Sequence, residues 1–282
     1  MSGSGSTEPV DEAQSATDQL PQLPRGGREL VPDYRLVAYY GAPGSEELGA
    51  LGIGTPSEAS AELMEQAEPY VTEQRPVMPV LELIASLASA SPGDDGLYRI
   101  QTPDSVIRRY LRAAREAEAL LLLDIQPGRS SFAAEAARLD RYLRQPDVGL
   151  ALDPEWHVGP EEVPGQVIGT VDAATVNRVS AQLAALTHRE ELPQKLFVVH
   201  QFTVGMIANR EELVARPGLA TILNADGFGD QPSKIAKYRD LRPPEGSGLG
   251  AGFKLFYNED TDLMSPSRVL ELRPEPDLIV YE

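Results

Sequence analysis

The chain has 282 residues, of which 41% are hydrophobic, so it is long enough to bury the core of one large domain or two small ones. Its formal net charge of −18 argues against binding to nucleic acid or to an anionic membrane surface, because both are held through clustered Lys and Arg. The sequence contains no cysteine, which excludes disulfides, thiolate catalysis and cysteine-type zinc sites. The composition therefore favours a neutral or cationic ligand.

The first 28 residues differ from the rest of the chain in composition. They are polar and rich in Ser, Gly, Pro and acidic residues, which is typical of disorder. They lack the basic and apolar regions of a signal peptide, and no run in the chain approaches the roughly 18 apolar residues of a membrane span. We expect a disordered leader or stalk over 1–28, one domain over 29–282 and no membrane span. We also expect a monomeric bacterial protein, secreted or tethered to the cell surface, whose signal or anchor has been removed.

One pattern recurs after the leader: a short apolar run, a polar turn, then a segment with helical period. Eight runs are expected to be strands: 34–41, 76–85, 119–126, 148–156, 195–202, 220–226, 251–259 and 277–282. A helical segment follows each of the first seven, including "NREELVARP" (209–217) after the fifth. Alternating strands and helices indicate a parallel sheet, and eight such units in about 250 residues predict a single-domain (β/α)8 TIM barrel. The alternative is an open doubly wound sheet, although the chain has neither GxGxxG nor GxxxxGK[ST].

Polar residues gather where the predicted strands end, which is where barrel enzymes form their active sites. Carboxylates, amides and aromatic residues outnumber cations there, a mixture that suits a neutral, polyhydroxylated ligand such as a carbohydrate. The candidate site residues are Tyr40, Glu82, Asp124, Gln126, Asp153, Glu155, Trp156, His157, His200, Gln201, Asn224, Asp226, Tyr257 and Glu259.

The stretch "LALDPEWHV" (150–158) is the most distinctive of these strand ends. If the strand continues, side-chain alternation places Asp153, Glu155 and His157 on one face. Two carboxyl groups packed together repel each other when both are ionised, which raises one pKa and supplies an acid near neutral pH. We therefore expect Asp153 and Glu155 to be catalytic, with Glu155 as the general acid; the alternative is that Asp153 caps a turn before "PEW".

An Asp-x-Glu at the end of the fourth strand resembles chitinase-like family 18 glycoside hydrolases and family 25 lysozymes. The resemblance implies that Glu155 is the catalytic acid and, for the first family, that Asp153 orients a substrate acetamido group, with Tyr257 in the place of a tyrosine near the strand ends. Glutamates on the fourth and seventh strands also resemble the retaining-glycosidase clan, with Glu155 and Glu259 as the pair. These resemblances imply a glycosidase acting on a neutral polysaccharide or a cell-wall glycan.

The sequence leaves other interpretations open. The barrel could be a non-catalytic module that binds glycans or a partner protein, with Trp156 as a sugar platform or a loop anchor. It could also be a metal-dependent hydrolase, with ligands among Asp124, Asp153, Glu155, His157 and His200. Because the sequence has no HxH, HExxH or DxDxDG motif, we expect no metal and no cofactor. The orientation of Asp153 and Glu155 toward an open cleft distinguishes an enzyme from a binding module.

Overall fold

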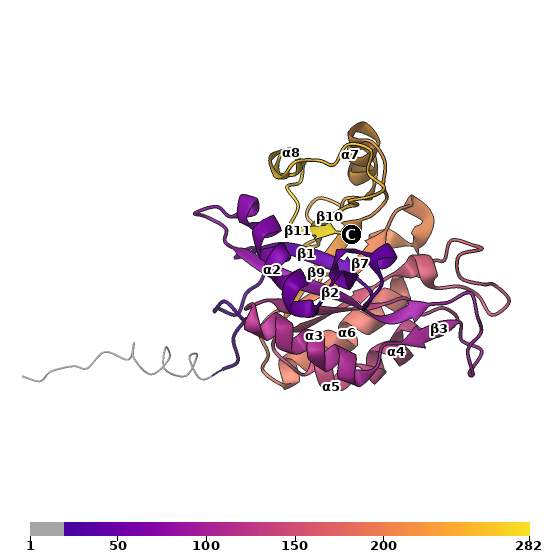
Figure 1. Ribbon diagram of the computed structural model, residues 1–282. Coiled ribbons are helices and arrows are strands. Elements are labelled where there is room, and N and C mark those ends of the chain that lie inside the picture. Colours follow the sequence, from indigo (N-terminus) through magenta and orange to yellow (C-terminus); the bar gives the residue numbers. More distant parts are fainter. Residues whose placement is uncertain (1–19) are drawn as a thin grey trace, which may run out of the picture.

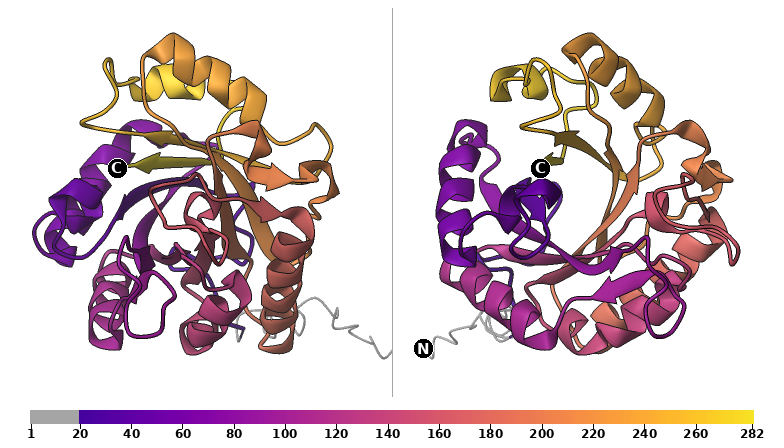
Figure 2. Two further views of the ribbon diagram at one scale, coloured as in Figure 1. Left: turned by 90° about the vertical axis from the view of Figure 1, so that its right-hand side faces the viewer. Right: turned by 45° about the vertical axis from the view of Figure 1, so that its right-hand side comes forward.

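The computed structural model describes residues 20–282, and eight parallel strands in it close into a barrel. The predicted (β/α)8 fold is confirmed, because β1 pairs with both β2 and β11 and leaves no open edge. Figure 2 shows the strands as a ring enclosed by helices. The barrel strands are β1 (Arg35–Gly41), β2 (Val77–Ala88), β4 (Leu120–Ile125), β5 (Val148–Leu152), β7 (Lys195–Gln201), β9 (Leu219–Ala225), β10 (Gly250–Leu255) and β11 (Leu278–Tyr281).

The helices lie outside the barrel and follow the strands as predicted, with one exception (Figure 1). Between β7 and β9 the predicted helix over 209–217 is wrong: the chain forms only the 3-10 turns η5 (Val204–Met206) and η6 (Arg210–Glu212) with the short strand β8 (Ile207–Ala208). The helices are α2 (Pro56–Ala67), α3 (Asp104–Glu116), α4 (Phe132–Arg138), α5 (Asp140–Leu143), α6 (Ala173–Arg189), α7 (Gln231–Leu241) and α8 (Pro266–Leu270).

The remaining short elements decorate the loops. β3 (Arg99–Gln101) pairs antiparallel with the end of β2, and β6 (Val171–Asp172) pairs with β8. Four further 3-10 turns are η1 (Glu46–Leu48), η2 (Ala50–Gly52), η3 (Glu68–Tyr70) and η4 (Pro154–Trp156). Among residues 20–282, no helix has the length and apolar character needed to cross a membrane.

Strand alternation divides the core into two layers. In β1, Leu36 and Ala38 point into the barrel, whereas Val37 and Tyr39 pack against the surrounding helices. The inner layer is apolar at the amino ends of the strands, with Met78, Val198 and Ile222 among its members. Packed side chains therefore close the barrel at the amino ends of its strands, and any ligand must enter from the carboxyl ends of the strands.

The predicted leader over 1–28 lies mostly outside the described residues, but residues 20–28 pack under the barrel. Leu23 is buried in the inner core layer. Arg25 donates hydrogen bonds to the carbonyls of Val77 and Glu118, and Arg28 to that of Leu192. These carbonyls lie at or just before the starts of three strands, so this segment covers the amino-terminal end of the barrel.

Candidate active site

The inward-facing position at the carboxyl end of every barrel strand carries a polar side chain. Each follows an inward-facing residue two positions earlier, as Glu82 follows Val80 and His200 follows Val198. Every second residue of a strand faces the barrel interior, so the same alternation that forms the apolar inner layer also brings these polar side chains together at the carboxyl ends of the strands. They are Tyr40, Glu82, Asp124, Asp153, His200, Asn224, Lys254 and Glu282.

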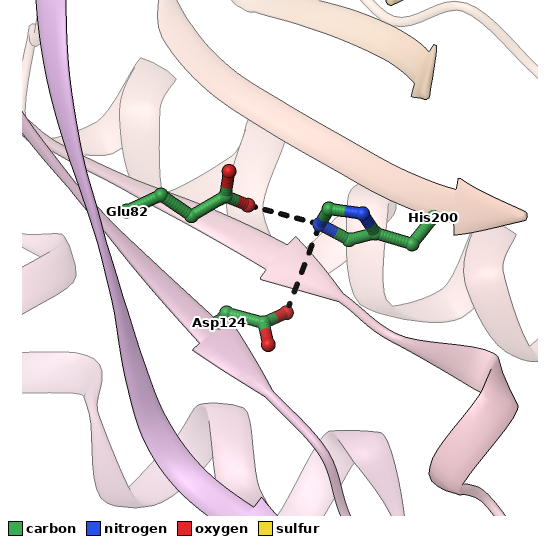
Figure 3. Close-up of side chains that lie close together, drawn as sticks. All are labelled: Glu82, Asp124 and His200. Atoms are coloured by element: carbon green, nitrogen blue, oxygen red, sulfur yellow. Dashed lines mark hydrogen bonds and ion pairs between the residues drawn. The ribbon is translucent and has the colours of Figure 1, made fainter. Parts of the chain in front are cut away.

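His200 lies at the centre of this polar layer and is almost fully buried. Its Nε2 lies 2.9 Å from Glu82 Oε1 and 4.0 Å from Asp124 Oδ1. Figure 3 marks both contacts with dashed lines. The Nδ1 atom of His200 lies 2.9 Å from Asp226 Oδ2. Burial opposes its protonation, but the charges of Asp226 and Glu82 outweigh burial and raise the pKa of His200 well above its usual value. Burial, with the Glu82 charge, raises the pKa of Asp124 to about 7.

Lys254 supplies the second buried cation of this layer. Its Nζ lies 2.6 Å from Glu282 Oε2, 3.8 Å from Asp226 Oδ2 and 3.6 Å from the centre of the Tyr40 ring. Burial works against its charge, but the carboxylates of Glu282 and Asp226 raise the pKa of Lys254 above its usual value. Gln126 Nε2 donates to the Tyr40 hydroxyl at 2.9 Å, and that hydroxyl donates to Asp124 Oδ2 at 3.2 Å. These bonds hold the Tyr40 ring against the ammonium group.

Above this layer the barrel opens into a cavity of about 380 Å³, within the size range of small-molecule sites. Carboxylates and ammonium groups meet aromatic rings in its wall, so the cavity offers both polar contacts and flat apolar surfaces. Its lining consists of Tyr40, Leu48, Ile84, Gln126, Asp153, Glu155, Trp156, Phe202, Asp226, Gly227, Phe228, Lys237, Lys254, Phe256 and Glu282.

Asp153 and Glu155 both line the cavity, but they do not form the pair expected from the sequence. The strand ends at Leu152, and Pro154 begins the 3-10 turn η4, so alternation does not continue. Asp153 Oδ1 accepts a hydrogen bond from the backbone N–H of Glu155, which is the capping role given above as the alternative. Burial, followed by the charge of Asp226, raises the pKa of the half-buried Glu155 to about 7. The acid near neutral pH is present, but its cause is not Asp153.

Four other predicted residues point away from the cavity. Gln201 follows the inward-facing His200 and therefore faces outward, where its Nε2 donates to the Leu241 carbonyl. Tyr257 stacks on Tyr281 outside the barrel, and Glu259 lies in an exposed turn. The Nδ1 atom of His157 lies 2.6 Å from the Thr170 carbonyl oxygen. His157 points away from the cavity because strand alternation is lost after Leu152. Gln201 points away because it occupies an outward-facing position of its strand.

Lys254 and Glu282 are the main site residues absent from the sequence-based candidates. The signal for Lys254 was present: a lysine inside the apolar run "AGFKLF" sits two positions after inward-facing Gly252. Glu282 follows inward-facing Val280 by the same spacing. Phe228 and Phe256 come from loops, whose course local sequence patterns do not predict.

No protein-family model and no curated protein matches this chain. A D-allulose 3-epimerase from Methylomonas sp. is among the solved structures that match, with a TM-score of 0.39 and 11% sequence identity over 89% of this chain and 84% of that chain. A likeness of this degree carries no conclusion about substrate or reaction.

The prediction of a glycoside hydrolase of the family 18 or family 25 type is wrong. The proposed assisting residue Asp153 caps a turn instead of pairing with Glu155. The proposed partner Glu259 lies in an exposed turn outside the cavity, so neither carboxyl pair that the resemblances implied is formed.

Proposed function

We propose that the protein is an enzyme that moves a proton at a carbon atom next to the carbonyl group of a neutral, hydroxylated substrate. The reaction class is isomerisation or epimerisation. One observation carries the proposal: Glu155, whose pKa is about 7, shares one small cavity with the cation Lys254. An acid–base group works best when its pKa lies near the working pH, because both of its forms are then available.

The two residues have complementary roles in such a reaction. The Glu155 carboxylate removes the proton from carbon, and the electrons of that bond move into the carbonyl group to form an enolate. The ammonium group of Lys254 stabilises the negative charge on the enolate oxygen, since a fixed cation in a site shielded from water is worth far more than in water. Glu155 then returns the proton to the neighbouring carbon, while the hydroxyl proton of the intermediate passes to the enolate oxygen, so that an aldose becomes a ketose or the reverse. Epimerisation would require a proton to reach the opposite face of the original carbon, because return by Glu155 to the same face regenerates the substrate. Substrate and product have the same composition, so the reaction needs no co-reactant.

The lining of the cavity indicates the substrate class. More than half of the lining residues are acids or aromatic residues, among them Asp226, Glu282 and Trp156. The negative charge of the acids disfavours anionic substrates, whereas Trp156 and Phe256 offer faces for the C–H surfaces of a sugar. A free aldose or ketose meets these requirements, and the cavity volume suits a single sugar unit.

Proton exchange with solvent tests the proposal and requires no assumption about the product. The purified protein is incubated in D2O with a panel of neutral aldoses and ketoses, and deuterium at carbon is detected by NMR. We expect enzyme-dependent exchange with at least one sugar, and a loss of about 10²–10⁴-fold in Glu155→Gln. The control Glu259→Gln, which changes an exposed acid outside the cavity, should keep the wild-type rate. Sugar binding without any exchange would instead identify a non-catalytic carbohydrate-binding barrel.

A further inference from the structure

Three potential metal ligands converge below the floor of the cavity. Glu82 from β2, Asp124 from β4 and His200 from β7 are each no more than 1% exposed. One ligand atom from each lies within 4.8 Å of the other two, and Figure 3 shows both acids directed at the same ring nitrogen of His200. None of the three lines the cavity itself.

The other ring nitrogen of His200 is already engaged. Its Nδ1 lies 2.9 Å from Asp226 Oδ2 and its Nε2 lies 2.9 Å from Glu82 Oε1, so a protonated ring donates to a carboxylate at each nitrogen. A metal ion would take the place of the Nε2 proton between Glu82 and Asp124, while Nδ1 keeps its hydrogen bond to Asp226. Histidines that bind metals commonly donate their second N–H to a carboxylate, which fixes the ring and makes the free nitrogen a better ligand.

Two carboxylate oxygens in this group lack hydrogen-bond partners. Both Glu82 Oε2 and Asp124 Oδ1 are buried and accept no hydrogen bond. Asp124 Oδ1 is the atom that faces His200 Nε2 at 4.0 Å, so it points into the cluster. A buried acceptor without a partner costs about 1–3 kcal/mol, and more when it is charged. An ion at this position would satisfy these oxygens.

We propose that Glu82, Asp124 and His200 Nε2 bind one divalent metal ion, of the Mn²⁺ or Zn²⁺ type. One imidazole and two carboxylates suit such ions better than they suit Ca²⁺, which prefers oxygen ligands alone. Ligand atoms about 2.1 Å from an ion lie about 3.0–3.4 Å apart at right or tetrahedral angles. The distances of 2.9 and 4.0 Å from His200 Nε2 bracket that range, so small side-chain movements complete the site.

The site goes beyond the proposed reaction and replaces the expectation of no metal. The ion lies below the cavity and connects to it through His200, which holds Asp226 in the cavity wall. A bound ion would therefore fix the position of the carboxylate that also faces Lys254. Metal binding can be measured without any substrate, so a failure of the metal-site proposal is distinguishable from a failure of the isomerase proposal.

Calorimetric titration of the chelator-treated full chain with MnCl2, and separately with ZnCl2, tests the site. We expect saturable binding of one ion per chain, with Mn²⁺ binding also visible as loss of the free-ion electron paramagnetic resonance signal. Asp124→Asn and Glu82→Gln should each weaken binding by more than about tenfold, because removing a ligand costs at least as much as removing its supporting partner. Glu155→Gln is the matched control, since it changes a nearby cavity carboxylate outside the cluster and should keep wild-type affinity.

Two results would overturn the proposal. One is the absence of saturable binding of either ion to the folded wild-type chain at millimolar concentration. The other is equal weakening in Asp124→Asn and Glu155→Gln, which would place the ion in the acidic cavity. Circular dichroism checks the fold of each variant; if the ligand variants do not fold, the wild-type titration and its metal-dependent rise in melting temperature decide.

Discussion

Replacing Glu155 by glutamine should stabilise the protein at alkaline pH while removing its activity. The pKa of Glu155 rises from 4.5 to about 7 on folding, so the folded state binds the proton more tightly than the unfolded state. The stability provided by the protonated carboxyl is complete below pH 4.5 and is lost as the pH rises through 7. Each pKa unit is worth about 1.36 kcal/mol, which gives about 3.4 kcal/mol, and screening of a partly exposed group reduces this to about 2 kcal/mol.

Glutamine has nearly the same shape and does not titrate, so the comparison isolates the carboxyl group. Urea unfolding at pH 5 and pH 8 gives the free energy of unfolding of both proteins. Between pH 5 and pH 8 the free energy of unfolding of Glu155→Gln should increase relative to that of wild type by about 1.5 kcal/mol, since this window contains about three quarters of the effect. The exposed-site control Glu259→Gln should show no such movement. An unchanged difference at the two pH values would refute the claim that Glu155 titrates near pH 7.

Three further predictions concern other parts of the chain. Lys195 is buried, and burial lowers its pKa from 10.5 to about 7. In urea unfolding, wild type should therefore gain on the order of 3–5 kcal/mol of stability relative to Lys195→Met between pH 7 and pH 10.5. A difference in unfolding free energy that does not change with pH would contradict this. Leu23→Ala should cost about 2–5 kcal/mol in the same assay because it leaves a cavity under the barrel, whereas exposed Gln22→Ala should cost almost nothing. Lys254→Met should reduce the deuterium-exchange rate by about 10²–10³-fold; a wild-type rate would remove Lys254 from the mechanism.

The sequence predicted the barrel because its strands are strongly patterned. Runs such as "ALLLLDI" are apolar on both faces, as strands buried between a barrel interior and helices must be. All eight predicted strands are present, with ends shifted by a few residues. The predicted helix over 209–217 fails because its few apolar residues do not form a helical stripe, and the connection is made by short turns.

The sequence predicted a site residue correctly where the alternation of inward-facing and outward-facing positions continues along the strand as far as that residue. Tyr40, Asp124 and Asp226 could be placed at the barrel mouth because their strands run regularly up to them. Glu155 lies in a turn that begins at Pro154, and this turn directs its side chain into the cavity. The local sequence pattern does not predict the direction of a side chain after such a turn. The origin of its raised pKa, which includes Asp226 some 70 positions later, requires the folded barrel. Secretion or surface tethering and the monomeric state stay predictions.

The pH dependence of deuterium exchange into the sugar tests the central claim most directly. If Glu155 is the base, with a pKa of about 7, roughly a tenth of it is ionised at pH 6 and nine tenths at pH 8. The rate at low substrate concentration should then rise about ninefold between these values, with its midpoint near pH 7, and the residual rate of Glu155→Gln should not show this transition. A wild-type rate independent of pH over this range, or an identical transition in Glu155→Gln, would contradict the assignment of Glu155 as the catalytic base.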